Sequence, residues 1–163
     1  MKNTIIKLRS TILVMLTHKV ALPLLKRIRK PLPFTFTKQE LAELPVGTLG
    51  NDLYVFLKKR NLELLKHYSR HDMKHILLGY GTTDKGEACL QCFMLGNGRI
   101  SFPVLATVVY SIFTMPEYWK AMREAYKKGK QSGPVHDLPW PNLLAERTRD
   151  IQDKIFAQTK IKS

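Results

Sequence analysis

The sequence predicts an all-α protein: one compact helical domain of about six to eight helices, including a basic amphipathic helix at the N-terminus. Three observations support this. Apolar residues recur at helical spacing in most segments. No stretch alternates apolar and polar residues over the length of a strand. The chain has 163 residues with 44% hydrophobic content, which is enough for one domain with a proper core.

Residues 4–29 form the first predicted helix, although Arg9 interrupts its apolar face. No run reaches the roughly 18 apolar residues of a membrane-spanning helix, and no signal-peptide cleavage site follows an apolar core. Residues 1–30 contain eight Lys or Arg and no acid, a charge of +8. We expect this segment, residues 1–30, to pack on the domain and to touch an anionic membrane with its cationic face; a plain solvated charged face is the alternative.

Residues 31–163 form the predicted helical metal- and lipid-binding domain. Its helices are bounded by prolines, glycines or capping residues, and they span residues 37–44, 49–57, 61–78, 84–95, 102–115, 116–128 and 141–160. On the predicted helix of residues 61–78, the apolar stripe expected to face the core contains Leu62, Leu65, Tyr68 and Ile76. The most apolar segment, residues 102–115, is interpreted as the central core helix or as the wall of a lipid-binding groove.

The net charge of +14, from 27 Lys and Arg against 13 Asp and Glu, indicates an anionic partner. A nucleic acid is disfavoured as the partner for two reasons. The basic N-terminal segment has no interleaved aromatic residue other than His18, and the sequence contains no known nucleic-acid-binding motif. An anionic membrane surface fits better, since the basic residues alternate with aliphatic ones.

Two cysteines, Cys89 and Cys92, stand in a C-x-x-C spacing. They are too few for a secreted disulfide framework, and the segment is predicted to be helical rather than part of a βαβ redox motif. On a helix Cys89 points roughly 200° away from Glu87, so it should not share a metal ion with that residue. We interpret both cysteines as buried helical thiols.

Three of the five histidines, His67, His71 and His75, fall within nine consecutive residues. On a helix Asp72 lies about 100° from His71, and His75 about 40°, so these three side chains share one arc. Two imidazoles and a carboxylate so placed can converge on one cation. Glu87 adds an oxygen ligand if the glycine- and threonine-containing segment of residues 79–83 turns the chain back.

The same residues carry a resemblance. His71-Asp72-x-x-His75, eleven residues and then Glu87 resembles the signature of the ubiquinone (coenzyme Q) biosynthesis family known as Coq-four. Further similar segments lie nearby or outside the motif: Leu77-Leu78-Gly79, Thr82, Gly86, residues 44–50 and residues 143–147. The similarity covers roughly Leu44 to Ile155, and it is specific at the motif and loose elsewhere.

The resemblance implies an enzyme: a metal-dependent C1 oxidative decarboxylase that replaces the C1 carboxylate of a polyprenylated hydroxybenzoate by hydroxyl. We expect His71, Asp72, His75 and Glu87 to be catalytic residues and ligands of a divalent metal, zinc first and iron or manganese as alternatives. One of the carboxylates could instead act as a base, and His67 could support the ligands from one turn away.

Expected partners are a prenylated quinone precursor or another isoprenoid lipid, an anionic membrane surface, other quinone-biosynthesis proteins and a second copy in a homodimer. No nucleic acid is expected. The expected location is cytoplasmic, peripheral to the inner face of the membrane, or at the mitochondrial inner membrane in a eukaryote. Two alternatives stay open: a non-catalytic prenyl-lipid-binding scaffold of the quinone-synthesis complex, and a metal-dependent phosphohydrolase, which an adjacent His-Asp pair also marks.

Overall fold

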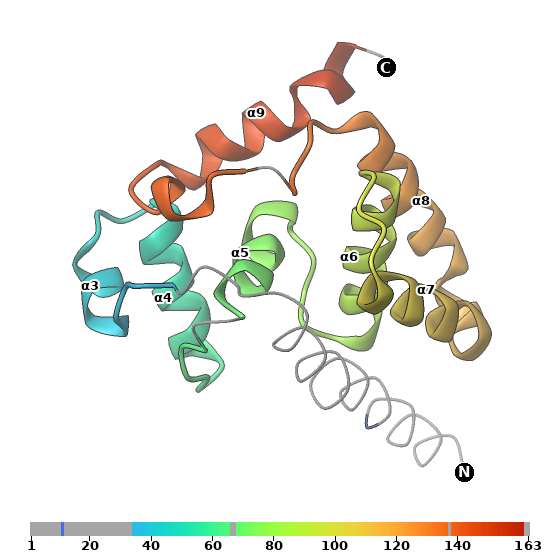
Figure 1. Cartoon of the computed structure of the whole chain (residues 1–163), viewed down its shortest axis with the longest axis horizontal. Coiled ribbons are helices and arrows are strands. Elements are labelled where there is room, and N and C mark those ends of the chain that lie inside the picture. The colour runs from blue at the N-terminus through green and yellow to red at the C-terminus, as the bar shows by residue number, and fades with distance from the viewer. Residues whose placement is uncertain (1–10, 12–33, 66–67, 137, 162–163) are drawn as a thin grey trace. The chain divides into compact units, whose positions relative to one another are not determined.

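A computed structural model of the chain confirms the all-α fold class (Figure 1). It describes residues 11, 34–65, 68–136 and 138–161. Within these residues there are seven α-helices and two short 3-10 helices: α3 (Lys38–Glu43), α4 (Leu49–Lys59), α5 (Ser69–Leu78), α6 (Asp84–Gly96), α7 (Phe102–Thr114), η2 (Pro116–Tyr118), α8 (Trp119–Gln131), η3 (Trp140–Leu143) and α9 (Thr148–Ile161).

The basic N-terminal helix predicted for residues 4–29 lies outside the described residues, apart from the exposed Thr11. The proposed boundary at residue 30 lies outside them too. None of the helices that the structure describes has both the length and the apolar character needed to cross a membrane.

The helices group into two compact units. One unit comprises residues 32–80 and 132–163 and contains α3, α4, α5 and α9; the other contains α6, α7 and α8 within residues 81–131. The core of the first unit is aliphatic and aromatic, with Leu41, Leu53, Met73 and Ile151 among its buried side chains. Helix α4 contacts both α3 and α5, and α5 also contacts α9.

Short-range capping explains the helix starts that agree with the sequence prediction. Glu40 N donates to Thr37 Oγ1, and Thr37 N donates to Glu40 Oε2 at 2.7 Å, which completes the predicted capping box of α3. Gly86 N donates to Thr83 Oγ1, so Thr83 caps α6 and the helix begins at Asp84 as predicted.

The second unit depends on a close approach of two helix backbones. A Cβ atom at Gly96 of α6 would overlap the carbonyl of Tyr126, and a Cβ atom at Gly129 of α8 would overlap the carbonyl of Phe93. Asn97 Nδ2 donates to Gly129 O at 3.0 Å across the same contact. Helices α6 and α8 therefore pack with hydrogen, rather than a side chain, between their main chains.

The predicted helix of residues 61–78 is wrong over its first half, because α5 begins only at Ser69. Asn61 has a φ of 51°, and Leu62 N and Asn61 N donate to Leu57 O and Lys58 O. This is the Schellman pattern that ends a helix with an asparagine in the left-handed region, and it ends α4. Leu62 and Leu65, predicted to be core, are exposed.

The predicted helix of residues 141–160 also begins too early. Residues 140–143 form η3, and α9 starts at Thr148. Between them Leu144 O and Glu146 O accept from Gly50 N and Leu49 N, while Thr148 N donates to Gly47 O. These hydrogen bonds to a segment about a hundred residues earlier replace the local helical ones.

Helix α7 is not the central core helix that its composition suggested. It buries one face, and it exposes a face whose members are all apolar: Phe102, Leu105, Val109, Ile112 and Phe113. The alternative role, as the wall of a lipid-binding groove, stays a prediction.

Candidate metal centre

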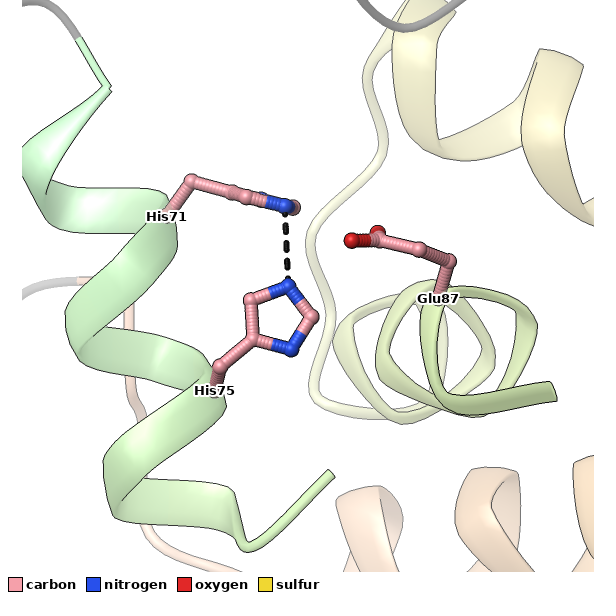
Figure 2. Close-up of side chains that lie close together, drawn as sticks. All are labelled: His71, His75 and Glu87. Atoms are coloured by element: carbon pink, nitrogen blue, oxygen red, sulfur yellow. Dashed lines mark hydrogen bonds between the residues drawn. The ribbon is translucent and has the colours of Figure 1, made fainter. Parts of the chain in front are cut away.

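Helix α5 places His71 and His75 one turn apart on the same face, as the four-residue spacing predicts (Figure 2). The Nε2 atoms of the two imidazoles lie 3.0 Å apart. The rings meet edge to face, with centroids 4.7 Å apart. Because a single helical turn fixes both Cβ atoms, this pairing follows from local structure alone.

The end of α5 determines which nitrogen of His75 can bind an ion. Gly79 closes the helix at a φ of 73°, and its N–H donates to His75 O. The following residue, Tyr80, directs its carbonyl oxygen to His75 Nδ1 at 3.0 Å. A carbonyl only accepts, so His75 Nδ1 carries the proton and a neutral His75 presents the lone pair of Nε2. Metal-binding histidines commonly have such a carbonyl partner.

Glu87 lies in the first turn of α6, directly after the segment that leaves α5. A Cβ atom at Gly86 would overlap the carbonyl of Gly81, so this segment folds back tightly against the start of α6. One ligand atom from each of His71, His75 and Glu87 lies within 4.8 Å of the other two (Figure 2). Figure 2 draws the Glu87 carboxylate facing the two imidazoles. That these residues bind a metal ion stays a prediction.

The donor set fits a divalent cation. Zinc–nitrogen bonds of about 2.0–2.1 Å in a tetrahedral site place two ligand atoms about 3.3 Å apart. Octahedral bonds of similar length place neighbouring ligands about 3.0 Å apart. The 3.0 Å between the two imidazole nitrogens suits both geometries. Glu87 Oε2 is buried, and a buried carboxylate oxygen is stabilised by a nearby positive charge.

Aromatic side chains that sequence reasoning did not connect with the motif hold the histidines. The ring of Phe56, on α4, stacks on His75 with centroids 6.2 Å apart. Tyr68, directly before α5, meets His71 edge to face at 5.4 Å. The three-residue spacing of Tyr68 and His71 was a usable signal for that contact, whereas no local pattern links Phe56 to His75.

The remaining predicted site residues have different outcomes. Asp72 is half-buried on α5 and does not belong to the group of three ligand atoms. His67 lies outside the described residues. Cys89 and Cys92 are free and buried on α6, as the sequence suggested. Burial raises the pKa of Cys89, and it raises that of Cys92 to about 12, so both thiols stay protonated near neutral pH.

Comparison with solved structures gives an informative similarity. No protein-family model matches the chain, and no curated protein matches it. The chain is similar to a crystal structure from Nostoc punctiforme described as a "putative ubiquinone biosynthesis protein", with 26% sequence identity and a TM-score of 0.60. The match covers 93% of this chain and 80% of the other. The fold therefore occurs in a solved protein whose description agrees with the resemblance seen in the motif.

Proposed function

We propose that this protein belongs to the Coq-four family and acts in the biosynthesis of ubiquinone or a related prenyl quinone. Two similarities support the proposal: the H-D-x-x-H and Glu motif of residues 71–87, and the structural similarity along 93% of the chain to a protein described as a "putative ubiquinone biosynthesis protein". The first concerns a few side chains, while the second concerns the path of most of the backbone.

The single observation that carries the catalytic part of the proposal is the convergence of His71, His75 and Glu87 within 4.8 Å. These residues would hold a divalent metal ion, with zinc, iron and manganese all compatible with two imidazoles and a carboxylate. The ion would supply a positive charge that neutralises a substrate acid and polarises a bound oxygen. Tyr80 O orients His75 for that task.

The proposed reaction is the oxidative replacement of a ring carboxylate at C1 of a polyprenylated hydroxybenzoate by hydroxyl. In sum, the ring carboxylate and one water become a ring hydroxyl, carbon dioxide, one proton and two electrons. The electrons pass to an acceptor such as dioxygen. Asp72, half-buried on the same helix, is available as the base that takes up the proton.

Genetic rescue tests the pathway, and metal analysis tests the site. Expression of this chain should restore quinone synthesis in a bacterial or yeast strain that lacks its Coq-four protein. His71→Ala and His75→Ala should remove the rescue, whereas His136→Ala, at an exposed histidine outside the group, should leave it intact. Failure of the wild-type chain to rescue would contradict the pathway.

A non-catalytic scaffold gives a different result in the same experiment. Under that alternative the two histidine variants, produced at wild-type levels, would still rescue, and the purified protein would contain no stoichiometric metal. Rescue that depends on both histidines, together with about one bound metal ion per chain by elemental analysis, supports the enzyme.

A further inference from the structure

Helix α7 exposes a continuous apolar face. With successive residues 100° apart, its five exposed apolar residues fall within an arc of about 100°: Phe102, Leu105, Val109, Ile112 and Phe113. The opposite arc is buried and includes Val104, Thr107, Val108 and Ser111. No residue of α7 carries a charge. A helix that is apolar all round is ordinarily covered on every side, so the exposed face of α7 needs an explanation.

The exposed apolar surface is large for a face in contact with water. Phe113 is 81% exposed, and Phe102 and Trp119 are 58% and 54% exposed. With about 150–250 Å² for each aromatic side chain, these three alone offer on the order of 400 Å². The largest apolar patch of a typical monomer is about 300–600 Å². The three aromatic side chains reach that range before the exposed aliphatic residues of α7 are added.

Aromatic residues occupy both ends of this face. Phe102 lies at the start of α7 and Phe113 at its end. Trp119 is held beside that end, because its Nε1 donates to Ile112 O at 2.8 Å. Tryptophan and phenylalanine in such positions are typical of helices that lie in the plane of a membrane interface. At about 1.5 Å per residue, α7 would run about 20 Å along such a surface.

Charge around α7 favours an anionic surface. Residues 88–116 contain no Asp or Glu, and η2, between α7 and α8, exposes one acid, Glu117. The following helix, α8, exposes four basic side chains, Lys120, Arg123, Lys127 and Lys130, against one exposed acid, Glu124. Each basic residue near an anionic membrane contributes about 1 kcal/mol of attraction.

We propose that this face of α7, defined by its five exposed apolar residues together with Trp119, docks on the surface of an anionic phospholipid bilayer. A second protein copy fits less well, because α8, the next helix, exposes four basic side chains against one acid, and two such surfaces brought together would repel each other. The exposed arc of α7 offers only apolar side chains. This inference is independent of the proposed reaction, since α7 contributes none of the candidate metal ligands.

Sedimentation of the full chain with phospholipid vesicles tests the proposal. The wild-type protein should bind vesicles of phosphatidylcholine with phosphatidylserine more tightly than phosphatidylcholine alone. Phe113→Ser and Phe113→Glu should each weaken binding about tenfold or more, because a large apolar side chain no longer leaves water. Val46→Glu is the matched control, since Val46 is 93% exposed but lies in the other unit. It should bind like the wild type.

A local readout separates docking through α7 from binding by another part of the chain. Lipids with brominated acyl chains should quench the tryptophan fluorescence of the wild type, and Trp119→Phe should remove most of that quenching, because Trp140 is buried. Quenching that persists in Trp119→Phe, or vesicle binding unchanged by both Phe113 variants, would overturn the proposal. A third result would also overturn it: light scattering shows that the wild type is a dimer and that Phe113→Ser dissociates it, while this variant still binds vesicles like the wild type.

Discussion

His75 Nδ1 donates a hydrogen bond to the carbonyl oxygen of Tyr80, 3.0 Å away. The two residues are joined by the last turn of α5 and by Gly79, whose φ of 73° directs the chain toward the imidazole. The contact leaves His75 Nε2 as the lone-pair atom, 3.0 Å from His71 Nε2. A main-chain carbonyl therefore prepares this nitrogen to bind a cation.

Gly79→Ala should weaken metal binding without removing a ligand. An alanine costs about 1–2 kcal/mol in the left-handed region, and relaxation of the backbone would move the Tyr80 carbonyl away from His75. We expect about a tenfold loss of metal affinity, as for other supporting partners of metal ligands. Gly98→Ala is the control, because Gly98 has a φ of 88° and open space like Gly79 but lies after α6. It should lose similar stability in urea unfolding while it keeps the metal affinity, measured by titration calorimetry.

The two acidic residues of the motif should differ in their effect on metal binding. Glu87 belongs to the group of ligand atoms and Asp72 does not. Glu87→Gln should therefore reduce affinity for zinc far more than Asp72→Asn, measured by competition with a chromophoric chelator. Glu43→Gln, at an exposed residue of α3, should have no effect. Equal losses from the Glu87 and Asp72 variants would mean that both carboxylates bind the ion.

Gly129→Ala should destabilise the packing of α6 on α8. The added methyl group would overlap the main-chain carbonyl of Phe93, which cannot rotate away. We expect the free energy of unfolding to fall by about 1–3 kcal/mol, the usual cost of overpacking. In Gly133→Ala the new Cβ atom would meet its nearest neighbour, Ile155 O, at 3.6 Å, an ordinary contact. That control should keep wild-type stability, and an equal loss in both variants would contradict the close approach of the two helices.

Cys92 should make stability fall at alkaline pH. Burial, with a smaller contribution from Cys89, raises the pKa of Cys92 from its ordinary value of 9.0 to about 12. Between these values the unfolded chain releases a proton that the folded chain keeps, so this stability is complete below about pH 9 and is lost as the pH rises toward 12. The slope approaches about 1.4 kcal/mol per pH unit.

Cys92→Ala provides the comparison for that measurement. Burial lowers the pKa of Lys128, which makes stability rise with pH instead of falling. This contribution is the same in the wild type and in the variant. The difference between their urea unfolding free energies at pH 8 and at pH 10 therefore isolates the thiol. A difference that does not change with pH would contradict the raised pKa. In the folded wild type both cysteines should also react slowly with a thiol reagent at pH 8.

The local part of the site was predictable because its hydrogen bonds span only a few residues. The four-residue spacing of His71 and His75 is a property of any α-helix, and Gly79 is an ordinary helix-ending residue. The contact of Phe56 with His75 was not predictable. Phe56 lies nineteen positions earlier in the chain, and its place on the ring depends on how α4 packs against α5.

The sequence alone therefore determined the all-α class, most helix boundaries with a local cap, and the pairing of two imidazoles on one helical face. Tertiary structure decided where Leu62 and Leu65 lie, where α9 begins, and which face of α7 is covered. The physical reason is the range of the interactions. Capping and helical spacing act within about one turn, whereas burial and the hydrogen bonds from Leu49 and Gly50 to Glu146 and Leu144 require segments about a hundred residues apart to meet.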